Sequence, residues 1–418
     1  MVRLATLVFA FLFAASLDEA AAATAIKFGK LWDGHRVVTD AVVVVQNGRI
    51  LSVTADGAIP QGADMIDLSR YTGIPGLIDS HTHMTFYWDP QSGTNPLRQP
   101  PRHVAITVFL AQANAKKTLE AGVTTVRDLT GFDGADLALR DLINMGAVAG
   151  PRMFVSGVGI RNDAFRPAGV ANAPAEAGKL AKSIIDAGAD WVKVYASTGR
   201  ADDLTGDQTV TYDELKAIVD TAHAVGRKVA VHSYGPGAAR DAIRAGADTL
   251  EHATGMDDAT IAELVRKKIW YVPTINHNQH YLDHADDVYK FTPEAKENFR
   301  KFIQRNVMTA QKAYRAGAHM LAGSDAVFTA FGTNMQELGW LVKAGMSNEQ
   351  ALQAATVSPA EMLGLEKDLG SVAPGFIADL VAVDGDPLAD IDVVIDNVRW
   401  VMKEGAIVVD KTHGPDAK

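Results

Sequence analysis

The sequence predicts an α/β fold: a (β/α)8 TIM barrel of parallel strands, joined to a small β-sandwich built from the N- and C-terminal segments. Eight strand-like apolar runs alternate with helical stretches, which is typical of repeated β-then-α units. The polar residues suited to chemistry stand at the carboxyl ends of these runs, where barrel enzymes build their sites. A doubly wound sheet is the alternative, and the position of the polar residues favours the barrel.

Residues 1–23 have the features of an export signal. Arg3 gives a positively charged start, residues 4–17 are largely apolar, and four alanines at 20–23 offer small-residue cleavage frames. The apolar part is shorter than the roughly 20 residues that a transmembrane helix needs, and an uncleaved anchor is the alternative. We therefore expect a periplasmic or secreted protein with no membrane span once the signal is removed.

Residues 24–72 and 369–418 are expected to form the two parts of the β-sandwich. An Asn47-Gly48 pair between apolar runs is a strong hairpin signal. The same pattern of short apolar runs separated by turns returns after Gly370, with Glu404-Gly405 as a second turn. Both ends are all-β, whereas the segment between them alternates strands with helices. We therefore expect the two ends to meet in one unit.

Residues 73–368 are expected to form the barrel. Its strands are predicted at 74–83, 123–126, 152–155, 191–195, 228–231, 249–251, 270–272 and 319–322. Residues 213–224 and 259–267 have the spacing of amphipathic helices. Helix starts are indicated by capping pairs at Thr211 with Glu214, Ser347 with Gln350, and Ser358 with Glu361.

Charge and cysteine content exclude several classes of function. The chain of 418 residues has a formal net charge of −10 and no concentrated basic run, which argues against a nucleic-acid partner. It has no cysteine, so disulfides, thiolate ligands and a cysteine nucleophile are excluded. Any metal ion must therefore be held by nitrogen and oxygen ligands.

Two histidines lie two residues apart in the first barrel strand. Side chains at such spacing share a face, so His81 and His83 can bind one metal ion together. By the same alternation, four further pairs should share a face at the ends of later strands: Trp191 with Lys193, Ala230 with His232, Leu250 with His252, and Leu321 with Asp325. If these faces point inward, the polar residues converge at the barrel mouth.

A lysine in the middle of a buried strand needs an explanation. The ammonium group of Lys193 must be paired, neutralised or moved to the surface, because a lone charge in low dielectric is unfavourable. One solution is reaction with carbon dioxide to give a carbamate, whose two oxygens can bridge two divalent cations. The alternative is an ion pair with a carboxylate at a strand end.

Several motifs together resemble the amidohydrolase superfamily, and within it the binuclear branch similar to Xaa-Pro and Xaa-Arg/Lys dipeptidases and related N-acyl amino acid hydrolases. The resemblance runs from about Ala25 to Val408. A lone His-x-His arises often by chance, whereas six ligands in the right order, on the right elements and with a matching tail are specific. The motifs are Gly-Leu-Ile-Asp-Ser-His81-Thr-His83, Val-Lys193-Val, Val-His232, Glu-His252, Gly-Ser-Asp325, and the tail from Gly370 to Val381.

The resemblance implies a site with two divalent metal ions, expected to be Zn2+. His81, His83 and Asp325 would hold one ion, and His232 and His252 the other. N6-carboxylated Lys193 and a hydroxide would bridge the two. Asp325 would also take the proton from the hydroxide and pass it to the departing amine. Tyr234 would donate to the oxyanion, and the alternative is a rim aromatic that packs the barrel mouth.

The loop after the third barrel strand departs from the family pattern. Relatives carry a glycine- and histidine-bearing loop that helps to bind the substrate carboxylate, whereas residues 156–165 offer Arg161. A guanidinium can bind a carboxylate in a two-pronged fashion, so Arg161 could replace that histidine. His277 is a second candidate for substrate contact. Residues 84–103, with Phe86, Tyr87 and Trp88, either line an apolar pocket over the mouth or anchor their own loop.

The leading hypothesis is metal-dependent hydrolysis of amide bonds in small molecules by a metal-bridging hydroxide, as in a dipeptidase or an N-acyl amino acid hydrolase. A cyclic-amide or ester hydrolase similar to imidazolonepropionase is the alternative enzyme, and Lys193 argues against it. A non-catalytic exported metal-binding protein is the alternative of another class. The expected partner is a small amide or dipeptide, and the sequence leaves open whether the chain forms a homo-oligomer.

Overall fold

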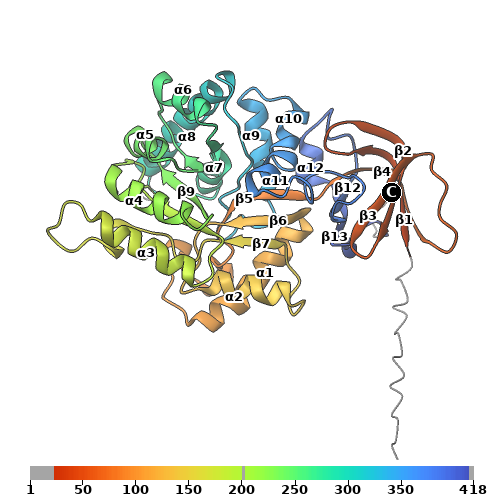
Figure 1. Cartoon of the computed structure of the whole chain (residues 1–418), viewed down its shortest axis with the longest axis horizontal. Helices are drawn as coiled ribbons and strands as arrows, with labels where there is room; N and C mark the ends of the chain where they lie inside the picture. Colours follow the sequence, from red (N-terminus) through yellow and green to blue (C-terminus); the bar gives the residue numbers. More distant parts are fainter. Residues whose placement is uncertain (1–22, 200–202, 414–418) are drawn as a thin grey trace, which may run out of the picture.

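The computed structural model describes residues 23–199 and 203–413. The predicted export signal, residues 1–23, lies outside the described residues except for Ala23. Across the described ranges, no helix combines the length and the apolar character needed to cross a bilayer. Figure 1 shows a body of strands surrounded by helices, with a separate β layer at one end.

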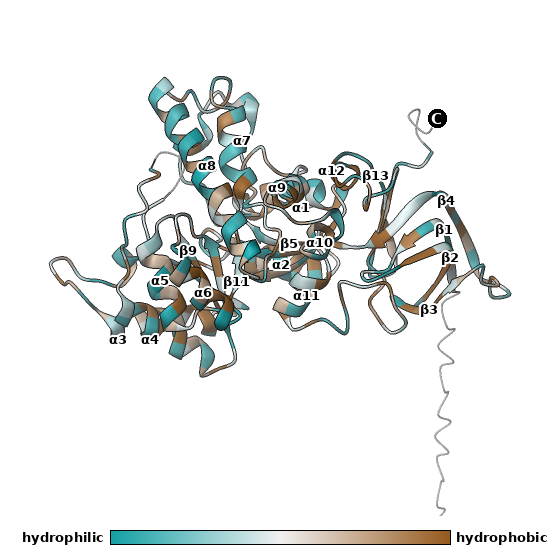
Figure 2. Ribbon diagram, turned by 90° about the horizontal axis from the view of Figure 1, so that it is seen from above, coloured by the Kyte–Doolittle hydropathy of each residue, from teal (hydrophilic) through white to brown (hydrophobic). Residues whose placement is uncertain are grey.

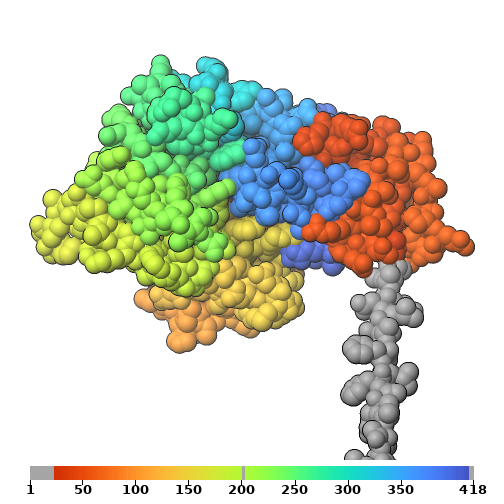
Figure 3. Space-filling view, viewed as in Figure 1, coloured from red at the N-terminus to blue at the C-terminus, as the bar shows by residue number. Residues whose placement is uncertain are grey.

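Strands from both ends of the chain form the β layer. It is one seven-stranded mixed sheet with the order β14-β13-β12-β4-β1-β2-β3. Figure 3 shows the red N-terminal and blue C-terminal segments side by side at this end of the molecule. The strands are β1 (Thr24–Trp32), β2 (Val37–Gln46), β3 (Arg49–Ala55), β4 (Asp64–Pro75), β12 (Leu380–Val383), β13 (Val398–Lys403) and β14 (Ala406–Asp410).

Both predicted turns of the β layer are present. Asn47 and Gly48 have φ of 52° and 74° and connect β2 to β3, as a two-residue hairpin of the primed type requires. Glu404 and Gly405 connect β13 to β14 with φ of 53° and 78°. The two turns touch, because a Cβ on Gly405 would lie 2.8 Å from the Cα of Gly48.

The body contains two parallel sheets. Three strands form one sheet and four form the other, in the orders β5-β6-β7 and β11-β10-β9-β8. Their bounds are β5 (Leu77–Thr82), β6 (Val123–Asp128), β7 (Arg152–Val155), β8 (Trp191–Tyr195), β9 (Lys228–Ser233), β10 (Thr249–His252) and β11 (Trp270–Val272). The α/β class is therefore confirmed, and seven of the eight predicted strands are present.

Backbone contacts join the two parallel sheets on both sides. Ile160, in the loop after β7, pairs with Val194 of β8, and Tyr271 of β11 pairs with Met320. The segment around Met320 returns to β5, because the Ser80 amide donates to the Ala322 carbonyl. The predicted eighth strand, 319–322, is not a regular strand: the Ala322 amide donates to Ala354, in the turn after α10, instead of extending a ladder.

Helices cover the outside of these strands. Figure 2 shows that the long helix α8 is largely teal, whereas brown residues concentrate on inner elements. The helices are α1 (Val104–Glu120), α2 (Ala135–Asn144), α3 (Pro174–Asp186), α4 (Tyr212–His223), α5 (Pro236–Ala245), α6 (Asp258–Arg266), α7 (Ile275–Asp283), α8 (Pro293–Arg315), α9 (Glu337–Lys343), α10 (Asn348–Gln353), α11 (Val357–Leu363) and α12 (Asp392–Asp396).

Two of the three predicted helix caps are confirmed. Thr211 with Glu214 and Ser347 with Gln350 form reciprocal capping boxes at the starts of α4 and α10. The third prediction is wrong, because α11 begins one residue before Ser358, at Val357. The chain leaves α10 through Thr356, whose hydroxyl donates to Leu352 rather than capping, so the helix start carries no serine or threonine cap.

Candidate active site

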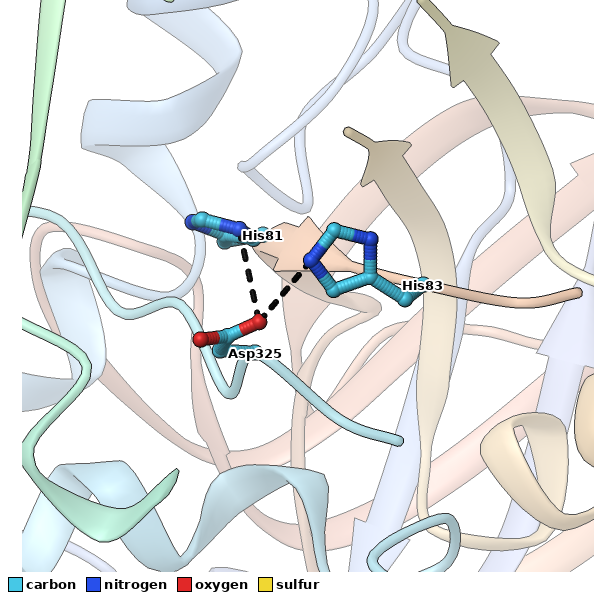
Figure 4. Close-up of side chains that lie close together, drawn as sticks. All are labelled: His81, His83 and Asp325. Atoms are coloured by element: carbon cyan, nitrogen blue, oxygen red, sulfur yellow. Dashed lines mark ion pairs between the residues drawn. The ribbon is translucent and has the colours of Figure 1, made fainter. Parts of the chain in front are cut away.

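His81, His83 and Asp325 form a buried cluster at the end of β5. The Nε2 atoms of His83 and His81 lie 3.0 Å and 3.5 Å from Asp325 Oδ1 (Figure 4). Each residue offers one potential ligand atom within 4.8 Å of the others. Asp325 is held against the strand because its amide donates to the His81 carbonyl at 2.7 Å, with a left-handed φ of 50°. The three residue types and their spacing fit one divalent metal ion.

Lys193 lies in the middle of β8 and is wholly buried beside this cluster. Its Nζ lies 3.2 Å from His81 Nε2. Among the described residues, Lys193 forms no ion pair with a carboxylate. The alternative of a salt-bridged lysine therefore has no contact to support it. Burial lowers the pKa of Lys193 to about 8, and Glu251 and Asp325 only partly oppose that effect.

His232 and His252 form the second half of the site, at the ends of β9 and β10. Their ring centroids lie 4.6 Å apart in an edge-on arrangement. His252 Nδ1 lies 2.6 Å from the Thr274 hydroxyl, which fixes the orientation of that ring. His232 Nε2 is buried and has no hydrogen-bond partner among the residues that the structure describes. A buried ring nitrogen without a partner is unfavourable unless a ligand satisfies it, and this atom therefore fits a metal ion.

One predicted face of the barrel is wrong. Leu250 belongs to the core between strands and helices, and its neighbours Thr249 and Glu251 instead contact interior Arg127. His252 still reaches the site, because its backbone turns into the left-handed region with φ of 65°. The other three predicted faces hold: Trp191, Ala230 and Leu321 pack together in one interior cluster.

Glu251 and Arg127 support His81 from below, and the sequence prediction missed both. Glu251 Oε2 lies 2.8 Å from His81 Nδ1, and Arg127 donates to Glu251 Oε1 at 2.9 Å. Burial opposes ionisation of Glu251, but Arg127 and His81 outweigh it and lower its pKa to about 2. The available signal was a charged residue at or directly after the end of a predicted strand: Glu251 ends 249–251, and Arg127 follows 123–126.

The three predicted substrate contacts lie around the same site. Tyr234 stacks on the His232 ring, with centroids 4.8 Å apart. The guanidinium carbon of Arg161 lies 3.8 Å from the centroid of the Tyr195 ring. His277 contacts Asp325 twice, with Nδ1 2.8 Å from its carbonyl oxygen and Nε2 3.4 Å from Oδ2. His277 therefore holds Asp325 as well as facing the cavity.

A cavity of about 670 Å³ opens above these residues. That volume lies within the range typical of small-molecule sites. Its wall includes all the predicted site residues except His81, which lies beneath it. Phe86 and Tyr87 line the cavity, whereas the Trp88 indole donates to Thr94 and anchors the loop. Residues 84–103 therefore both line the cavity and anchor their own loop.

Comparisons with known proteins show what this chain is similar to. The Amidohydrolase family profile matches residues 72–408. Ochratoxinase from Aspergillus niger is 28% identical over 443 aligned residues, which cover 96% of this chain and 89% of that protein. Imidazolonepropionase from Streptomyces avermitilis is 25% identical over 370, covering 83% and 81%.

Solved structures extend the similarity to the fold. An Xaa-Pro dipeptidase with bound methionine has a TM-score of 0.83 and 30% identity, covering 92% of this chain and 99% of that one. A prolidase complexed with N-methylphosphonate-L-proline has a TM-score of 0.81 and 28% identity, covering 93% and 100%. Because the family profile spans most of the sequence and the buried histidine, lysine and aspartate cluster lies within it, the chain belongs to the amidohydrolase family.

Proposed function

We propose that this protein hydrolyses amide bonds in small molecules with two divalent metal ions, as a dipeptidase or an N-acyl amino acid hydrolase. The observation that carries the proposal is the gathering of six ligand-type side chains at one cavity, five of them in its wall. His81, His83 and Asp325 would hold one ion, His232 and His252 the other, and carboxylated Lys193 would lie between them. The similarity to a dipeptidase and to ochratoxinase supports the choice of an amide bond.

The environment of Lys193 favours carboxylation. Carbon dioxide reacts with a neutral amine: the nitrogen lone pair forms the N–C bond, one proton leaves, and a carbamate anion results. With a pKa of about 8, roughly a tenth of Lys193 is neutral near pH 7, far more than for an exposed lysine. A bound pair of cations would then stabilise the carbamate, and zinc is the ion we expect from nitrogen and oxygen ligands.

When bound, the two ions would supply a nucleophile at neutral pH and polarise the substrate carbonyl. The remaining work belongs to the side chains. Asp325 accepts a proton and returns it to the amide nitrogen, which is a poor leaving group until protonated. Burial opposes ionisation of Asp325, but His277, His81 and His83 outweigh it and keep its pKa well below the usual range, so Asp325 starts as a base.

Tyr234 and Arg161 would hold the substrate. The Tyr234 side chain lines the cavity above His232, where its hydroxyl would donate to the developing oxyanion. Arg161 lines the same cavity, is exposed to solvent and would bind a substrate carboxylate. We also propose that the ring of parallel strands is a (β/α)8 barrel, and that the protein acts after export to the periplasm or the cell exterior.

A screen of metal-loaded protein against dipeptides and N-acyl amino acids tests this function. We expect hydrolysis that is lost on chelation and restored by Zn2+ or another divalent ion. A protein that gains thermal stability from metal but hydrolyses none of these substrates would instead be a non-catalytic metal-binding protein. Preferential turnover of cyclic amides or esters would favour the imidazolonepropionase-like alternative.

A further inference from the structure

Three phenylalanines from separate loops gather on the His83 side of the cavity: Phe86 after β5, Phe132 after β6, and Phe328 after Asp325. Phe86 and Phe132 stack with ring centroids 4.5 Å apart and an interplanar angle of 30°. Phe86 lies 6.0 Å from Phe328 and 4.9 Å from the ring of His83. All three line the cavity, so this phenylalanine cluster adjoins the proposed metal ligands.

One residue of the cluster, Phe328, has an unfavourable backbone conformation. Phe328 has φ of 52°, in the left-handed region that bulky residues rarely adopt. Its amide donates to the Phe86 carbonyl at 2.9 Å, so the two loops hold each other in place. Backbone strain of this kind concentrates at sites that bind or react, because the surrounding structure must maintain it. The strain at Phe328 therefore indicates that the phenylalanine cluster is part of a binding site.

Phe132 leaves apolar surface exposed at the cavity wall. Phe132 is 48% exposed although its ring stacks on Phe86 at the cavity wall. An aromatic ring entering the cavity would cover this surface. Binding would then gain free energy from the removal of apolar area from water and from the offset or edge-on geometry that aromatic pairs favour. An aliphatic group of two carbons would cover much less of it.

We propose that the phenylalanine cluster is a subsite for an aromatic ring of the substrate. With Arg161 as the partner of a carboxylate, the substrate class is an N-acyl amino acid or dipeptide that carries both an aromatic ring next to the scissile amide and a free carboxylate. This inference rests on the proposed amide hydrolysis and adds to it the group that the site selects.

The test compares N-benzoylglycine and N-acetylphenylalanine with N-acetylglycine, using metal-loaded wild type, Phe132→Ala and Phe109→Ala. Phe109 is the matched control, because it is 72% exposed on α1 and does not line the cavity. We expect at least one aromatic substrate to have a kcat/KM roughly tenfold or more above that of N-acetylglycine. Phe132→Ala should lower that ratio at least fivefold, and Phe109→Ala should leave it unchanged. Equal kcat/KM values for all three substrates, or an unchanged ratio in Phe132→Ala, would overturn the proposal.

Calorimetry separates the subsite from the reaction. N-benzylglycine and N-ethylglycine have an amine in place of the amide and cannot be hydrolysed. We expect N-benzylglycine to bind roughly tenfold more tightly to wild type, and Phe132→Ala to lose most of that difference. If this preference is found but no amide is cleaved, the subsite stands and the hydrolytic function is wrong. If both ligands bind equally and N-acetylphenylalanine also has no advantage over N-acetylglycine, the subsite is wrong whatever else the protein hydrolyses.

Discussion

Glu251 holds His81 by its Nδ1 atom, at 2.8 Å, and thereby sets which nitrogen of His81 faces the site. A carboxylate with a pKa of about 2 is ionised and can only accept, so the proton of the neutral imidazole must be on Nδ1. Burial and Lys193 lower the pKa of His81 itself to about 4, which keeps the ring neutral. The Nε2 lone pair then faces the Lys193 Nζ at 3.2 Å and is available to a metal ion.

Replacing Glu251 with Gln should weaken metal binding. Partners of this kind orient ligand histidines, and their loss typically lowers metal affinity by about 10 to 100-fold. The variant also leaves the buried Arg127 charge without its carboxylate, so the melting temperature should fall. Metal titration and thermal melts measure the two effects. Glu263→Gln is the control, because Glu263 is half-buried in an ion pair with Arg266 on α6, which the site does not include. Equal metal affinity in Glu251→Gln and wild type would contradict the role assigned to Glu251.

Asp325→Asn should keep the fold and bound metal but lose turnover. The amide has nearly the same shape and retains an oxygen, but it cannot accept and return a proton. Removal of a general acid or base typically lowers rates by about 10² to 10⁴-fold. Metal analysis and kcat, measured on the same preparation, separate the two properties. A variant with normal kcat would remove Asp325 from proton transfer.

Arg161→Ala should raise KM for substrates that carry a free carboxylate by roughly 10-fold or more, since hydrogen bonds to charged groups contribute about 1.5–3 kcal/mol. Substrates whose carboxylate is converted to an amide should show little change, because they make no ion pair with the guanidinium. Arg161→Lys keeps the charge but not the two-pronged geometry. Its KM for free-carboxylate substrates should therefore lie between those of wild type and Arg161→Ala. Unchanged KM values for the free-carboxylate substrates would show that Arg161 does not bind this group.

Glu337 should make the protein less stable as pH rises. Its wholly buried carboxyl accepts from the Ile275 and Asn276 amides at the start of α7, yet burial raises its pKa to about 8. In the unfolded chain the value is near 4.5, so between these two pH values the folded protein binds more protons than the unfolded one. Stability from this group is therefore full below about pH 4.5 and is lost as pH rises to about 8.

Glu337→Gln cannot titrate, so its melting temperature relative to wild type should rise by several degrees between pH 5 and pH 8.5. Thermal melts at both pH values measure this difference. Glu294→Gln, an exposed position in the first turn of α8, is the control and should show no such trend. A difference between Glu337→Gln and wild type that is the same at both pH values would contradict the raised pKa.

Local signals in the sequence predicted local structure well. The Asn47-Gly48 turn and the Thr211 capping box depend on residues that are neighbours in the chain, and both are present. Strand alternation likewise placed Lys193 and His232 on inward faces. It failed at Leu250 because β10 presents its other face, and the left-handed turn at His252 then brings the ring inward. Periodicity contains no information about such a turn.

Long-range partners could not be predicted in this way. Glu251 and Arg127 lie 124 positions apart, and only folding shows that each charge satisfies the other and that both support His81. The phenylalanine cluster is a similar case, because its three rings come from three different loops. The sequence predicted the ligand types, and the structure adds the contacts that orient them.

Anomalous diffraction from crystals of the metal-loaded protein tests the central claim most directly. The account predicts two metal peaks in the floor of the cavity, one beside His81, His83 and Asp325 and the other beside His232 and His252. It also predicts electron density extending from Lys193 Nζ toward both. A single peak together with an unmodified Lys193, or metal bound only away from these six side chains, would contradict the account.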